Sequence, residues 1–253
     1  MSVSWGPDVA YYFFLIFARL GTILMLLPAL GESTIPMRLR LTFALAFSLV
    51  LYPLILPNLG AVPVTLGGLM AALGHELAVG FILGGLTRLI ITAAQVAGAV
   101  IAFQMGLSMA QTSDPTQPGV QGAIVGNFLA MLGVTLIFAT DLHHVLLAGI
   151  YASYSYFPPD APLMLGDAAE MATQIVAQAF LIGTQMSAPF LVFGLVFYLG
   201  LGILGRLMPQ IQVFFMAMPA NIIIGLILFA LLLSLTMTLY MTYLEDHFSQ
   251  FLG

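Results

Sequence analysis

Asp141, His143 and His144 form a cluster of side chains that could bind a metal ion. Imidazole nitrogens and carboxylate oxygens are common ligands of zinc. On a regular helix, however, adjacent side chains point about 100° apart, so both rings are not expected to reach one ion. Asp141 and His144 would share a helix face, but two ligands are fewer than the three of a catalytic zinc site. We therefore predict interfacial or capping residues here, and no metal or cofactor in the chain.

Two charged residues, Arg19 and Glu76, lie near the middle of strongly apolar stretches. A charged side chain inside a membrane is costly, and it usually pairs with another group or faces water. We predict that Arg19 and Glu76 form a buried charge pair that holds two helices together. Proton conduction is the alternative, but a relay normally needs more than one acidic site. Arg88 is an unsuitable partner for Glu76, because 12 residues separate them by about 18 Å along a helix.

A polar, turn-rich segment, 104–119, separates two apolar stretches. Irregular backbone at membrane depth is tolerated only where protein or a water-filled cavity surrounds it. We therefore predict that this segment lines or closes a passage, with Gly106 and Gly119 as hinges. Methionines in it could seal a pore, although filling a core is a common use of methionine. The candidate residues are Gln104, Met105, Gly106, Ser108, Met109, Asp114, Pro115 and Gly119.

The elements that position these residues are expected to be membrane helices. The chain is 61% hydrophobic and 6% charged, with a mean hydropathy of +1.11. No acidic or basic residue occurs between Met171 and Gly205 or between Leu207 and Leu244. Both stretches exceed the roughly 20 residues that cross a hydrocarbon core. The sequence predicts an all-α polytopic membrane protein with kinked helical hairpins and an irregular plug-like loop.

The predicted helices cross the membrane about six times. Pro189 is expected to divide the 169–205 stretch, and Pro219 to bend the last helix, because proline lacks the donor that continues a helix. Arginine placement predicts cytoplasmic loops near Arg38 and Arg206. No linker divides the chain, so we predict a single domain over 1–253. The predicted helices cover residues 9–29, 41–57, 66–87, 89–109, 122–142, 144–157, 169–205 and 211–244.

Composition and motifs exclude several classes of function. The chain has no lysine and five arginines, so it lacks the basic stripe of a nucleic-acid-binding protein. It has no cysteine, which excludes thiolate chemistry and disulfides. Nucleotide-binding loops, nucleophile elbows and zinc-protease patterns are absent. We therefore expect a protein that is not an enzyme.

Four blocks resemble the FliR family, the export-gate membrane component of bacterial type III secretion, and the flagellar members most. The Gln-Met-Gly-Leu-Ser block with the later Asp-Pro, and the Arg-x-x-Pro-Gln-x-x-Val-Phe block, are the more specific ones. Asp141–His144 departs from the family, which often has a Gly-rich turn with one histidine there. The blocks are Arg19–Pro28 with Pro36–Arg40; Glu76 with Gly80 and Gly84; Ala97–Ser108 with Asp114 and Pro115; and Gly205–Phe214 with Pro219 and Gly225.

The resemblance implies a subunit that assembles with FliP-like and FliQ-like gate proteins and an FlhB-like switch protein. Together these would form a channel for unfolded export substrates in the bacterial inner membrane, within the flagellar basal body. The resemblance also implies that the segment 104–119 plugs the closed channel. Arg206, with Pro209 and Gln210 in the last block, is expected to anchor contacts in the assembly.

Two other functions remain open at the level of sequence. One is a stand-alone ion or small-solute transporter, which would need coordinated polar groups at the middle of the membrane. The other is the equivalent subunit of a virulence-type secretion system.

Overall fold

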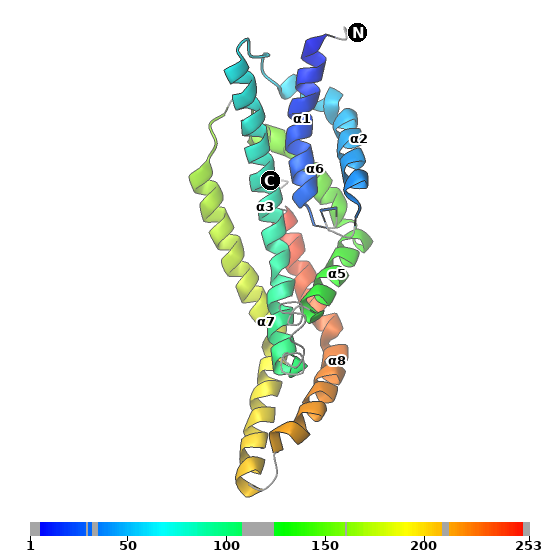
Figure 1. The fold of residues 1–253 in the computed structure, drawn as a ribbon, viewed down its shortest axis with the longest axis vertical. Coiled ribbons are helices and arrows are strands. Elements are labelled where there is room, and N and C mark those ends of the chain that lie inside the picture. The colour runs from blue at the N-terminus through cyan, green and yellow to red at the C-terminus, as the bar shows by residue number, and fades with distance from the viewer. Residues whose placement is uncertain are drawn as a thin grey trace. The chain divides into compact units, whose positions relative to one another are not determined.

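The computed structural model describes residues 6–28, 30–31, 35–107, 124–159, 161–208 and 213–249, and the regular elements in these ranges are all helices (Figure 1). The all-α prediction is therefore confirmed. The helices are α1 (Pro7–Leu26), α2 (Met37–Ile55), the short 3-10 helix η1 (Leu56–Asn58), α3 (Leu66–Gln104), α5 (Ile124–Ala139), α6 (Leu142–Tyr156), α7 (Leu165–Leu207) and α8 (Val213–Ser249).

Five helices among the described residues are long and apolar enough to cross a membrane. The consecutive helices α5 and α6 meet at an angle of 80°, and together they make a sixth candidate span. The predicted six crossings agree with the larger number of candidate spans, in which α5 and α6 together count as one. The five candidate spans are Asp8–Leu26, Met37–Asn58, Leu66–Gln104, Leu165–Leu207 and Met216–Ser249.

Two predicted interruptions are wrong. The sequence led us to end one helix at 87 and start another at 89, but α3 is continuous for 39 residues. No proline lies in this region, and a glycine inside a helix costs only about 1 kcal/mol relative to alanine. Pro189 was expected to divide its stretch, yet it lies inside the continuous helix α7. Membrane helices tolerate proline because nearby groups satisfy the freed carbonyl oxygen.

The chain separates into two compact units, and α3, α7 and α8 contribute residues to both. Unit 1 consists of residues 1–90, 140–175 and 246–253. Unit 2 consists of residues 91–139 and 176–245. Unit 1 therefore holds α1, α2, α6 and the first part of α3. Unit 2 holds the second part of α3, α5 and most of α7 and α8.

Close contacts between helices organise unit 1. The helix α1 packs against α2, and two glycines of α3 lie on α1. A methyl group on Gly80 would lie 2.8 Å from the Arg19 carbonyl oxygen, and one on Gly84 would lie 2.8 Å from Leu26 Cβ. Small residues of this kind let membrane helices approach closely. Gly80 and Gly84 therefore serve packing within the chain, whereas Gly85 faces open space.

Unit 2 is packed in the same way. The backbones of Gly98 on α3 and Gly126 on α5 are in direct contact. The Tyr240 ring of α8 lies against Gly133, and its hydroxyl donates a hydrogen bond to the Ile91 carbonyl at 3.4 Å. The helices α7 and α8 nevertheless bury few of their residues within the chain. Their large apolar surface is suited to lipid or to neighbouring subunits.

Candidate functional site

Arg19 of α1 is the centre of a buried polar site in unit 1. Its side chain and that of Glu76 on α3 are both fully buried. Arg19 Nε donates to Glu76 Oε2 at 2.6 Å, and Nη2 donates to Oε1 at 2.8 Å. Two parallel hydrogen bonds between a guanidinium and a carboxylate form the strongest common ion-pair geometry. The structure thus brings together the two charged residues that the sequence singled out.

The same guanidinium also closes the end of α6. Arg19 Nη1 donates to the Ser153 carbonyl at 3.0 Å, and Nη2 donates to the Phe157 carbonyl at 2.8 Å. The Ser153 carbonyl also accepts the Phe157 N–H at 2.9 Å, and a cation at the carbonyl end of a helix is favourable because the helix dipole is negative there. The Tyr154 ring lies 4.0 Å from Arg19 Cζ, which adds a cation–π contact. One side chain therefore connects α1, α3 and α6.

This arrangement suits a structural role better than proton conduction. Both Glu76 oxygens accept hydrogen bonds from Arg19, and His75 Nδ1 lies 3.7 Å from Glu76 Oε1. A proton carrier has to exchange partners, whereas this carboxylate is held by two charge-assisted bonds.

A cavity of about 360 Å³ lies beside this site in unit 1. Three side chains with polar groups line it, those of Ser153, Tyr156 and Asp167, and the Ser153 hydroxyl donates to the Ile150 carbonyl. A solute site needs several converging polar groups. The cavity therefore lacks the lining of a binding site for an ion or a polar solute. Its apolar lining includes Val79, Ile82, Leu83, Leu86, Met164 and Met171.

The second site is the end of α3 in unit 2, where the chain enters the segment 104–119. The Met105 side chain is fully buried, and Gly106 adopts a left-handed conformation with φ of 73°. Glycine takes this conformation without the steric cost that other residues carry. The Gly106 N–H donates to the Phe103 carbonyl at 3.1 Å, so the helix ends in a tight turn.

Two neighbouring helices hold this turn. Asn221 of α8 is 2% exposed, and its Nδ2 donates to the Gln104 carbonyl at 3.2 Å. A methyl group on Gly225 would lie 2.7 Å from Met105 Cγ, and Gly194 of α7 contacts the Gln104 side chain. The absence of side chains at these glycines lets α7 and α8 enclose the turn. The base of the segment is therefore anchored in packed protein.

The other predicted residues are placed as follows. Arg206 is exposed in the last turn of α7. The other predicted residues of the segment 104–119, and the two that were predicted to act with Arg206, lie outside the described residues. They are Ser108, Met109, Asp114, Pro115, Gly119, Pro209 and Gln210.

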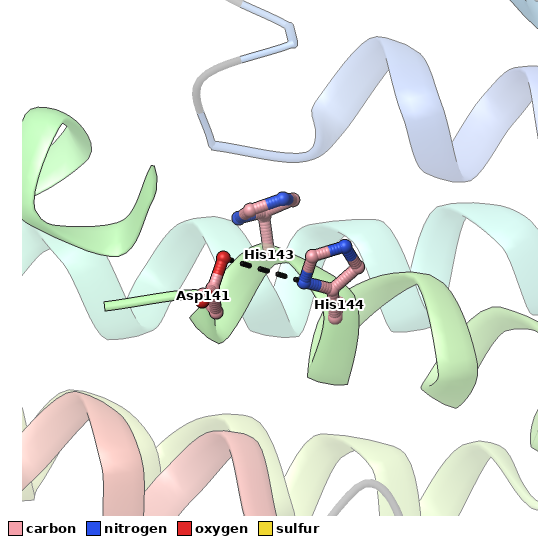
Figure 2. Close-up of side chains that lie close together, drawn as sticks. All are labelled: Asp141, His143 and His144. Atoms are coloured by element: carbon pink, nitrogen blue, oxygen red, sulfur yellow. Dashed lines mark ion pairs between the residues drawn. The ribbon is translucent and has the colours of Figure 1, made fainter. Parts of the chain in front are cut away.

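The Asp141–His144 cluster lies at the junction of α5 and α6 (Figure 2). We expected the two rings to point apart, and that expectation is wrong, because their centroids are 4.0 Å apart. Both histidines belong to the regular helix α6, so their side-chain rotamers bring the rings together, while Asp141, just before the helix, has a left-handed φ of 60°. Asp141 Oδ1 lies 3.6 Å from His144 Nδ1.

Comparison with known proteins assigns the chain to a family. The sequence profile described as Bacterial export proteins, family 1, matches residues 10–247. The chain belongs to this family. It is 47% identical over 220 residues to the flagellar biosynthetic protein FliR of Caulobacter vibrioides, covering 87% of each chain. It is 31% identical over 232 residues to FliR of Bacillus subtilis, covering 90% of this chain and 88% of that protein.

A virulence-type relative is more distant. The Yop proteins translocation protein T of Yersinia pestis is 24% identical over 239 residues, covering 93% of this chain and 88% of that protein. This member of the FliR family is thus a membrane component of the flagellar type III export apparatus, in the inner membrane, and it is not an enzyme.

Sequence reasoning missed Asn221 in this member of the FliR family. It lies in the uncharged stretch that we interpreted as a plain membrane span, and it carries no charge to draw attention. The available signal was an asparagine among apolar residues, since polar side chains inside membrane helices usually bond to another helix. The role of Phe157 had no such signal, because only its backbone carbonyl accepts a hydrogen bond from Arg19, whereas Ser153 accepts with its carbonyl at 3.0 Å and with its hydroxyl at 3.5 Å.

Proposed function

We propose that this chain contributes the closing element of the export channel, and that residues 104–119 plug the channel at rest. The observation that most supports the proposal is the anchored base of the segment. Asn221, Gly194 and Gly225 hold Gln104 and Met105, and the left-handed Gly106 lies directly after them. A closing element needs a fixed attachment and a pivot, and these residues supply both.

The partners that we propose are FliP-like and FliQ-like gate subunits and an FlhB-like switch protein. Unfolded export substrates would pass through the assembled channel. The apolar surface that α7 and α8 leave uncovered supports such an assembly. We further propose that the two units act as one export-gate domain over 1–253, since three helices contribute residues to both units.

Deleting Ser108–Gln117 tests the plug. The deletion removes ten residues beyond the anchored base and leaves Gln104, Met105 and Gly106 in place. The assembled gate in membrane vesicles is expected to become leaky to ions, which is measured as a rise in conductance. Replacing the same ten residues with a Gly/Ser segment of equal length is the matched control for loop length. Unchanged conductance of a deletion variant that still assembles would reject the plug role.

Affinity purification from bacterial membranes tests the proposed partners. The tagged chain is expected to carry the two small gate proteins with it. A chain that purifies alone and transports ions in liposomes would instead favour the stand-alone transporter. No feature of the described residues supports that rival, because Arg19 and Glu76 satisfy each other and the cavity beside them is apolar.

A further inference from the structure

We propose that Asp141, His143 and His144 form a binding site for a divalent transition-metal ion of the zinc class. None of these residues belongs to the Arg19 pair or to the segment 104–119. The three side chains come from the junction of α5 and α6, and they lie close together (Figure 2).

The distances fit such a site. One ligand atom from each residue lies within 4.8 Å of the other two. Ligands about 2.0–2.1 Å from a tetrahedral zinc ion lie about 3.4 Å from one another. The Asp141 and His144 side chains are 78% and 69% exposed, so small side-chain rotations can close the difference. Asp141 Oδ1 and His144 Nδ1, at 3.6 Å, are already near that spacing.

The three side chains come from the start of one helix. Asp141 is the N-cap residue of α6 and is in the left-handed conformation, which aspartate tolerates better than most residues because its short side chain bonds locally. His143 and His144 follow it in the first turn of α6, and their rings lie at a centroid distance of 4.0 Å.

The Asp141 carboxylate does not cap α6, although an aspartate at this position ordinarily caps its helix. An aspartate at the N-cap position normally accepts a hydrogen bond from an N–H group of the first helical turn. Asp141 occupies that position of α6, but its side chain makes no capping bond. Its carboxylate instead faces the His144 ring (Figure 2). The carboxylate is thus directed toward the imidazoles.

The ligand chemistry selects the class of ion. Two neutral imidazoles and one carboxylate suit zinc, nickel, copper or cobalt, whereas magnesium and calcium prefer oxygen ligands. Three protein ligands leave a coordination position for water, and the exposure of the site allows water to reach it. The positive end of the α6 dipole opposes a cation, and the Asp141 charge offsets that effect.

Titration of the full chain with zinc tests this proposal. The protein is purified in detergent with an affinity tag that contains no histidine, and it is treated with a chelator. Isothermal titration calorimetry with Zn²⁺ alone is expected to show one ion per chain. The visible absorption of bound Co²⁺ provides a second readout, because its intensity and shape report the ligand geometry.

Substitution of each ligand identifies the site. Asp141→Asn, His143→Ala and His144→Ala are each expected to weaken Zn²⁺ binding by about tenfold or more, since even indirect partners of a metal contribute 10–100-fold. Asparagine also tolerates the left-handed conformation, so Asp141→Asn preserves the backbone at this position. His247→Ala, which changes a histidine on α8, is the matched control and is expected to bind normally.

Three outcomes would overturn the proposal. The first is no saturable binding up to about 1 mM Zn²⁺, which corresponds to about 4 kcal/mol of binding free energy. The second is one ion per two chains, which would indicate a site shared between copies. The third is an equal loss of binding in His247→Ala and in the three ligand variants. Circular dichroism of each variant separates loss of ligands from loss of fold.

Discussion

Substitution of Glu76 by alanine is expected to destabilise this protein strongly. The substitution leaves the Arg19 guanidinium fully buried without a counter-charge. The carbonyls of Ser153 and Phe157 still accept its other hydrogen bonds, so the side chain remains held inside the protein. An ionised group that is buried without a partner is one of the few causes of large destabilisation by a single substitution.

The magnitude follows from the two hydrogen bonds that are lost, at 2.6 and 2.8 Å. A hydrogen bond to a charged group contributes about 1.5–3 kcal/mol, so two of them contribute about 3–6 kcal/mol. Removing one partner of a buried ion pair independently costs about 3–5 kcal/mol. With about 2–4 °C for each kcal/mol in a chain of this size, the melting midpoint should fall by roughly 6–20 °C.

The assay is thermal unfolding of the detergent-purified chain, with matched variants. Glu76→Gln retains an acceptor of nearly the same shape, so its midpoint should fall less than that of Glu76→Ala. Glu245→Ala removes an exposed acidic residue of α8, and it should change stability by no more than about 0.5 kcal/mol.

A double substitution decides whether the reasoning is correct. Replacing a buried ion pair with apolar side chains is often nearly neutral, because no unpaired charge remains. The variant with Arg19→Leu and Glu76→Leu should therefore be more stable than the sum of its single substitutions predicts. It will still lose the bonds to the end of α6, so recovery will be incomplete. Strictly additive effects would refute the coupling that we derive from the structure.

Three further predictions concern other parts of the chain. Gly106→Ala should cost about 1–2 kcal/mol, because φ is 73° there, and should make the assembled gate leaky in a conductance assay; a tight gate would contradict its role as a pivot. Gly80→Ala should lower the free energy of unfolding by about 1–3 kcal/mol, because its methyl group would overlap the Arg19 backbone. Gly85 faces open space, so Gly85→Ala should be neutral or stabilising, and equal effects of the two substitutions would argue against close packing of α1 on α3. Arg206→Ala should reduce co-purification with the gate partners more than it changes conductance, and normal recovery of the partners would count against an anchoring role.

The helical membrane architecture could be predicted from the sequence because lipid permits few alternatives. Twenty or more uncharged residues in a row form a helix there, since every backbone group has to be satisfied within the segment. The partnership of Arg19 and Glu76 followed from the same physics, because isolated buried charges are costly. The sequence is informative wherever the environment leaves a residue only one favourable choice.

Contacts that carry no charge were not predictable in the same way. Asn221 donates a hydrogen bond to the carbonyl of Gln104, which lies 117 residues earlier in the chain. Asparagine and glutamine also occur elsewhere in membrane helices, so neither residue type identifies its partner. The left-handed backbone at Asp141 was likewise unpredicted, because we assumed regular helix geometry on both sides of it. The continuity of α3 depends on packing along its whole length, which a local pattern of glycines does not reveal.

The contacts of Arg19 also impose an order on biosynthesis. The ribosome makes α1 before α3 and α6, and the acceptors of Arg19 lie 57, 134 and 138 residues further along the chain. The newly inserted α1 therefore carries a cation whose counter-charge arrives only with α3, and its hydrogen bonds are complete only when α6 has been made. Until then the unpaired Arg19 charge favours a position of α1 near water or next to the insertion machinery, because such a charge is costly in lipid. The contacts around α1 are thus complete only after residues 134 and 138 positions further along the chain have been made.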